Sequence, residues 1–162
     1  MSDAIIKMIL TCVGWAVAYF VVLFITNRAG VGYNVLKNAL KWLAELKKLC
    51  VGLRTQLSSK GFTLQSKSAI HGLKKVVRCE KGIARILTVY MFDNKDDKNV
   101  SQAMDLVSSV PELCRKAAAI AGDGRSEDLS AVFSQVDDCI SRASSLIRQS
   151  IERDMKEELL KV

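Results

Sequence analysis

The stretch "LKNALKWLAELKKLCVGLRTQL", Leu36 to Leu57, sets the fold class, because its apolar residues recur at steps of three and four. This spacing places them on one face of an α-helix, while basic side chains occupy the other faces. A seam that lasts three heptad-like repeats predicts packing against other helices. The seam consists of Leu36, Ala39, Leu43, Leu46, Cys50, Leu53 and Leu57.

Three further helical segments follow the seam. The apolar spacing predicts one from about Ile70 to Met91, which ends before the polar turn "DNKDDKN", and another that begins near Asn99. Within the latter we expect Pro111 to kink or divide the helix, because proline has no N–H for the helical ladder, and a serine at 108 or 109 to cap the restart.

The last predicted helix begins near Ser126 and carries apolar residues as far as Leu159. It exceeds 30 residues, long enough to extend beyond a compact bundle. The sequence has few alternating runs of β-branched residues and a single proline, which favours helices over strands. The sequence therefore predicts an all-α protein with an antiparallel bundle of about four helices.

Upstream of the seam, Met8–Thr26 is a run of 19 residues without a charged side chain. A helix of that length spans about 28 Å, close to the roughly 30 Å hydrocarbon core of a bilayer. The run has no polar stripe that could face water, and it is longer than the about 7–15 apolar residues of a cleaved signal. We expect a retained transmembrane helix rather than a cleaved signal or a buried core helix.

Basic residues near the ends of this run are divided unevenly. Only Lys7 precedes it, whereas five basic residues follow closely: Arg28, Lys37, Lys41, Lys47 and Lys48. By the positive-inside rule the C-terminal side is expected in the cytoplasm. Scattered cysteines without a C-x-x-C pair favour reduced packing thiols, which suits that compartment: Cys12, Cys50, Cys79, Cys114 and Cys139.

The chain is thus expected to comprise a single-pass anchor over residues 1–28 and a helical soluble domain over residues 29–162. Gly30 and Gly32 make either a hinge or part of one continuous helix. The soluble domain has a basic juxtamembrane half and an acidic half. From Ala29 to Phe92 there are 12 basic and 2 acidic residues, a net charge of +10, and from Asp93 onward 10 basic and 14 acidic, a net of −4.

The basic half suggests a contact with anionic lipid headgroups, which attract juxtamembrane cations by about 1 kcal/mol each. An ordinary solvated face is the alternative. Nucleic acid is unlikely, because interleaved aromatic residues and a recognisable binding module are both missing from the sequence. The residues expected at the membrane interface are Lys37, Lys41, Trp42, Lys47 and Lys48.

Motifs for chemistry are not found in the sequence. His71 is the single histidine, and neither phosphate-binding glycine loop occurs. "DNKDDKN" resembles a calcium loop only in its acidity. The adjacent pairs Asp137-Asp138 and Glu157-Glu158 point about 100° apart on a helix, so they do not converge on one metal. We therefore expect a protein that is not an enzyme, with no cofactor, metal or catalytic site.

Two C-terminal stretches carry a family resemblance: "RILTVYMFDNKDDKNVSQAMDLVSSVPELCRKAAAI" (85–120) and "LSAVFSQVDDCISRASSLIRQSIERDMKEELLKV" (129–162). Their helix, polar turn, proline-containing helix and long acidic-ended helix resemble the bacterial 5-bromo-4-chloroindolyl phosphate hydrolysis (XpaC-like) family. The matching points are Tyr90, Lys98, Pro111 and Asp154. The resemblance implies a membrane-attached helical protein and supplies no catalytic residue; the phosphate-ester hydrolase of the family name is the less favoured function.

Together these features predict a membrane-anchored adaptor or scaffold whose partners are the bilayer and another protein or a second copy of the chain. An envelope-bridging protein with an exported coiled-coil stalk is the alternative. The apolar stripe of the last helix is the expected partner contact, although the same residues could instead pack internally. These candidate contact residues are Ile147, Ile151, Met155 and Leu159.

Overall fold

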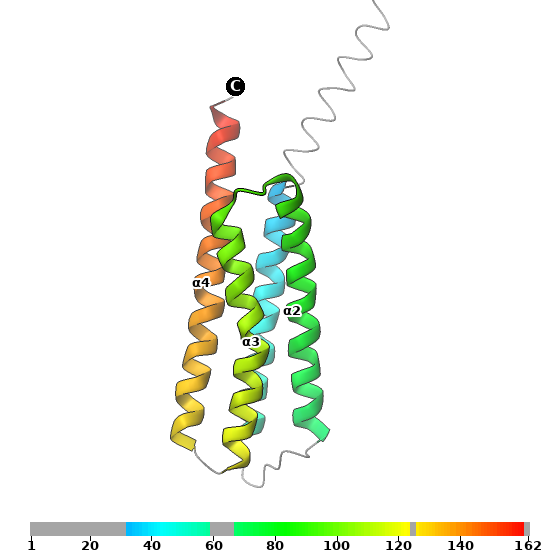
Figure 1. Cartoon of the computed structure of the whole chain (residues 1–162), viewed down its shortest axis with the longest axis vertical. Helices are drawn as coiled ribbons and strands as arrows, with labels where there is room; N and C mark the ends of the chain where they lie inside the picture. The colour runs from blue at the N-terminus through cyan, green and yellow to red at the C-terminus, as the bar shows by residue number, and fades with distance from the viewer. Residues whose placement is uncertain (1–31, 59–66, 124–125, 161–162) are drawn as a thin grey trace, which may run out of the picture. The chain divides into compact units, whose positions relative to one another are not determined.

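The computed structural model describes residues 32–58, 67–123 and 126–160, and the regular structure in these ranges is entirely helical. A helix over residues 32–57 is followed by α2 (Lys67–Asp93), α3 (Lys98–Gly122) and α4 (Ser126–Leu159). Successive helices run in opposite directions along the bundle axis (Figure 1). The prediction of an antiparallel helical bundle is confirmed.

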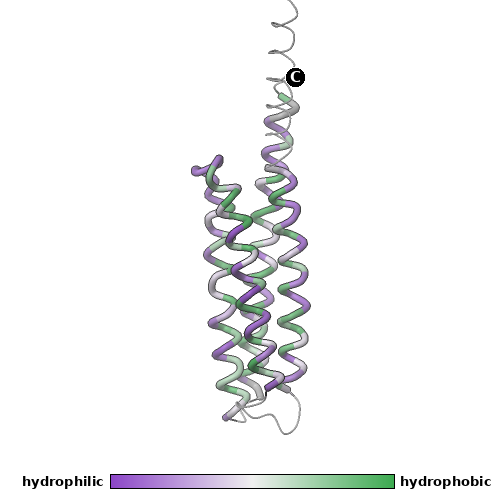
Figure 2. Tube along the Cα trace, turned by 90° about the vertical axis from the view of Figure 1, so that its right-hand side faces the viewer, coloured by the Kyte–Doolittle hydropathy of each residue, from purple (hydrophilic) through white to green (hydrophobic). Residues whose placement is uncertain are grey.

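The predicted seam of the helix over residues 32–57 faces the core. All seven of its residues are at most 4% exposed. The other three helices contribute their own buried aliphatic stripes, so that hydrophobic and hydrophilic positions alternate along each helix (Figure 2). Burial of each large aliphatic side chain contributes about 1.5–3 kcal/mol, which makes this core the main source of stability.

Contacts between the helices define their order around the core. The helix α3 packs against both α2 and α4. The helix over residues 32–57 closes the bundle, since its Trp42 carbonyl accepts a hydrogen bond from the Cys79 thiol of α2 at 3.5 Å. Across the core from it lies α3, where the Sγ atoms of Cys50 and Cys114 are 3.9 Å apart. Cys50, Cys79, Cys114 and Cys139 are all free thiols.

Pro111 does not divide its helix. The helix α3 is continuous from Lys98 to Gly122, and Pro111 lies buried inside it. Ser108 and Ser109 do not cap a restart, because their hydroxyl groups donate to the carbonyl oxygens of Asp105 and Leu106 at 2.8 and 2.7 Å. The expected division is wrong, because close packing of the apolar stripe holds the helix together across a single missing hydrogen bond, and the alternative of a kink stays a prediction.

The length expected for the last helix is confirmed. With 34 residues, α4 is nine residues longer than the 25-residue α3, a difference of about 13 Å along the axis. Its C-terminal turns continue past the α2–α3 turn, at one end of the bundle (Figures 1 and 2).

The compact unit Val35–Val162 contains α2, α3 and α4 and the first helix from Val35 onward. Within the described residues, no helix combines the length and apolar character needed to cross a bilayer. The predicted span Met8–Thr26 and the Gly30 position lie outside the described residues. The anchor and its boundary at residue 28 stay predictions.

Candidate functional site

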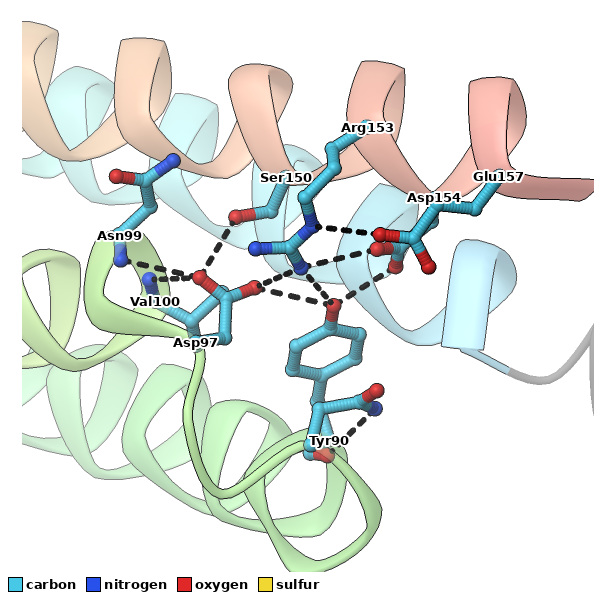
Figure 3. Close-up of polar contacts among 9 residues, drawn as sticks. Tyr90, Asp97, Asn99, Val100, Ser150, Arg153, Asp154 and Glu157 are labelled. Carbon is cyan, nitrogen blue, oxygen red and sulfur yellow. Dashed lines mark hydrogen bonds and ion pairs between the residues drawn. The ribbon is translucent and has the colours of Figure 1, made fainter.

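A polar cluster joins three segments at the end of the bundle from which α4 continues (Figure 3). Tyr90 belongs to the last turn of α2, Asp97 to the α2–α3 turn, and Ser150, Arg153 and Asp154 to α4. Among the described residues, every buried side-chain nitrogen and oxygen atom has a hydrogen-bond partner. We call the five residues Tyr90, Asp97, Ser150, Arg153 and Asp154 the Asp97 cluster.

Asp97 is the centre of the cluster and is only 3% exposed. It is the N-cap of α3, because its Oδ1 accepts from the N–H groups of Asn99 at 3.0 Å and Val100 at 3.2 Å. Oδ1 also accepts from the Ser150 hydroxyl at 3.1 Å, and Oδ2 accepts from Nη2 of Arg153 at 2.8 Å. Burial alone would raise the pKa of this carboxyl, but the hydrogen bonds from Arg153, Ser150 and Val100 outweigh it and lower the pKa.

Tyr90 connects the two carboxylates of the cluster. Its hydroxyl oxygen lies 2.7 Å from Oδ2 of Asp154 and 3.1 Å from Oδ2 of Asp97. The hydroxyl has one proton, so it donates to the nearer Asp154, and Nη2 of Arg153 donates to it at 3.4 Å. Burial, followed by the hydrogen bond to Asp154 and the two negative charges, raises the pKa of Tyr90 above its usual value.

This arrangement suits the fixing of helices rather than proton transfer. Both oxygens of the Asp97 carboxylate accept strong hydrogen bonds, and Tyr90 is held neutral, so neither group has a pKa near neutrality as a general acid or base requires. The exposed His71 lies about 28 Å away along α2. In the described part of the chain, no three His, Cys, Asp or Glu residues gather as a metal site would require.

The Asp97 cluster was not predicted as a unit from the sequence, although α4 carries a signal for it. The buried positions of α4 continue from Ala143 and Ile147 to Ser150, which is fully buried, and the next step of four reaches Asp154. Polar residues at core-facing positions predict buried hydrogen-bond partners. The sequence does not show which segment supplies these hydrogen-bond partners, because this depends on how α2 and α3 pack against α4.

The predicted partner contact on α4 divides into a buried and an exposed part. Ile147 is fully buried, Ile151 is partly buried against the core, and Met155 is 49% exposed. Steps of four residues turn by about 40° each on a helix, so this stripe rotates out of the core while Ser150 and Asp154 stay inside. The Leu159 side chain is outside the described part of the structure. Met155 therefore remains as the exposed candidate, whereas Ile147 belongs to the core.

The residues predicted for a membrane interface do not share one surface. Lys37, Lys41 and Lys48 lie within about 40° of one another around their helix. Lys47 instead lines a pocket together with residues of α4. Trp42 faces α2, where its ring would lie 2.9 Å from a Cβ added at Gly82. Lys48 also pairs with Glu45 at 3.6 Å. A contact with lipid headgroups would thus involve the face that carries Lys37, Lys41 and Lys48. Trp42 would not take part, because its ring packs toward α2.

Comparisons of the chain with protein-family models, with curated proteins and with solved structures found no match.

Proposed function

We propose that the protein is a membrane-anchored helical adaptor. In this proposal Met8–Thr26 anchors the chain, the bundle lies in the cytoplasm, and the C-terminal turns of α4 present an apolar contact to another helix. The partner is another protein or a second copy of the chain. The observation that carries the proposal is the 49% exposure of Met155 on a helix that extends beyond its neighbours.

The Asp97 cluster supports this role by giving the exposed turns of α4 a defined direction. Ser150 and Arg153 bond to Asp97, and Asp154 accepts from Tyr90, immediately beside Met155. A helix end held by several side chains loses less conformational entropy when a partner binds than a free end would. Arg153 is held in the cluster by its ion pair with Asp97 at 2.8 Å.

The proposal is tested by Met155→Glu in the full-length protein. We expect this variant to lose the crosslinked species formed by a photoreactive amino acid at position 156, since a charge would enter an apolar contact. The thermal melt should stay nearly unchanged because Met155 is half exposed. Val51→Glu is the matched control, because Val51 is 53% exposed on another helix. Equal crosslinking by both variants would refute the α4 contact.

The envelope-bridging alternative makes an opposite prediction for topology. It requires the bundle outside the cytoplasm, so a reporter fused after Val162 would be active only if exported. The resemblance to the 5-bromo-4-chloroindolyl phosphate hydrolysis family is likewise a proposal. It agrees with an all-helical, membrane-attached protein and assigns no reaction.

A further inference from the structure

A groove runs along the outer side of α2, between Trp42 of the preceding helix and Arg115 of α3. Its volume is about 680 Å³. Four basic residues of α2 line it: Lys74, Arg78, Lys81 and Arg85. Among the described residues, none of those that line the groove is acidic, and together with Arg115 they carry five positive charges. We call it the α2 groove.

These positive charges are largely uncompensated. Arg115 pairs with Glu112 at 2.6 Å. The four α2 cations make no ion pair with any of the residues that the structure describes. An array of like charges repels itself and favours an anionic ligand.

Part of the lining of the α2 groove is apolar. Leu73 and Val77 are partly exposed, and Ile70 is 42% exposed beside them. Trp42, 43% exposed, forms one wall, and its ring can approach α2 closely because position 82 is glycine. A ligand that fills the groove therefore needs apolar side chains as well as negative charges.

The spacing of the cations distinguishes between kinds of anion. Lys74, Arg78, Lys81 and Arg85 follow one another at steps of four, three and four, and extend about 16 Å along the helix axis. A single phosphate or carboxylate reaches only neighbouring members of such a row. A second helix with acidic residues at steps of three and four matches the whole row, and its apolar stripe would cover Ile70, Leu73 and Val77.

We propose that the α2 groove binds an acidic amphipathic helix of a partner protein. Nucleic acid would match the charges, but its phosphate backbone has no counterpart for the apolar residues of the lining. A lipid surface is broad, whereas these residues line a concavity. The inference does not depend on the contact proposed for Met155, which lies on α4, so the two can fail separately.

The test uses the full-length protein in nanodiscs of neutral lipid and a fluorescent designed peptide of about five helical turns. The peptide carries leucine at steps of three and four with glutamate on both sides, and a control peptide has lysine in place of glutamate. Fluorescence anisotropy should show binding of the acidic peptide only. Reversal of two groove charges, Lys74→Glu with Arg78→Glu, should weaken its binding at least about tenfold.

The matched control is Lys75→Glu with Lys116→Glu, which removes the same net charge from exposed neighbouring positions outside the groove. It should change peptide affinity by less than about threefold. Equal weakening by both double variants would overturn the proposal, because it would show general attraction to a basic surface. Failure of the acidic peptide to bind would also overturn it. If phosphatidylserine vesicles or a single-stranded oligonucleotide then bind through Lys74 and Arg78, the occupant is lipid or nucleic acid instead.

Discussion

Nη2 of Arg153 lies 2.8 Å from Oδ2 of Asp97, and these residues are 56 positions apart in the chain. Asp97 is almost completely buried, whereas the Arg153 side chain is 42% exposed. The ion pair therefore fixes the start of α3 to the part of α4 that approaches solvent. The same carboxylate therefore caps the N-terminus of α3 and forms an ion pair with α4.

Removal of the Asp97 charge should destabilise the bundle. Asp97→Asn keeps an N-cap oxygen but loses the charge paired with Arg153, and we expect a cost of about 1–2 kcal/mol, given the half-exposed arginine. Asp97→Ala also loses the cap, at about 1 kcal/mol more. Asp96→Asn, one residue earlier and exposed, should stay within about 0.5 kcal/mol of the native protein. Chemical denaturation measures the three free energies of unfolding, and equal values for positions 96 and 97 would contradict the role of the cluster.

Stability should depend on pH through the same two groups. The pKa of Asp97 is lowered in the folded protein, so its contribution is complete above the ordinary carboxyl pKa of about 4 and is lost as pH falls through the folded pKa. The pKa of Tyr90 is raised, so its contribution is complete below about pH 10 and is lost as pH rises further. Unfolding measured against pH should show a smaller acid loss in Asp97→Asn and a smaller alkaline loss in Tyr90→Phe. If the free energy of unfolding changed with pH in the variants as it does in the native protein, these groups would have the same pKa in the folded and unfolded states.

Gly52 and Gly82, which lie in different helices, should respond differently to alanine. A Cβ at Gly52 meets nothing within 4 Å, so Gly52→Ala should stabilise its helix by about 0.5–1 kcal/mol. A Cβ at Gly82 would lie 2.9 Å from Trp42, which must move, so Gly82→Ala should gain less or lose stability. Denaturation compares the free energies of unfolding, and Trp42 fluorescence in a Trp15→Phe background reports the displacement. An equal gain at both positions would show that the Trp42 ring is not packed on α2.

Thiol reactivity should follow burial. Cys50 and Cys114 are at most 2% exposed, and the hydrogen bond with Cys114 together with burial raises the pKa of Cys50. Burial and the nearby Glu45 raise the pKa of Cys79 to about 11, which leaves little reactive thiolate at neutral pH. Cys139 is partly exposed. In a Cys12→Ser background a maleimide should therefore modify Cys139 first, as mass spectrometry of the labelled peptides would show; equally fast labelling of Cys50 would contradict the packing.

The predicted span is open to a direct test. Replacement of Val21 and Val22 with arginine should cost about 2.5–3.5 kcal/mol of insertion free energy per charge at the helix centre. The native protein should stay in the membrane fraction after alkaline carbonate treatment, and the variant should leave it or be degraded. The transmembrane prediction would be wrong if carbonate extracted the native protein. Serine replacements at both positions provide the uncharged control.

The sequence by itself determined the helical class, the seam from Leu36 to Leu57 and the unusual length of α4. These features are local, because a period of 3.6 residues is present in the order of apolar and polar residues. Tertiary structure decided whether Pro111 breaks its helix, because packing on neighbouring helices outweighs one lost hydrogen bond. It also decided that Ile147 belongs to the core whereas Met155, on the same helix, stays about half exposed.

Tertiary structure alone brought the functional candidates together. Tyr90 and Asp154 are 64 positions apart but share a hydrogen bond, and Trp42 lies on a glycine of another helix. The basic residues of α2 are evident in the sequence, but the wall that Trp42 adds beside them is not. Such contacts depend on the rotation and register of each helix, which are set by the packing of all four helices together rather than by the pattern of any one.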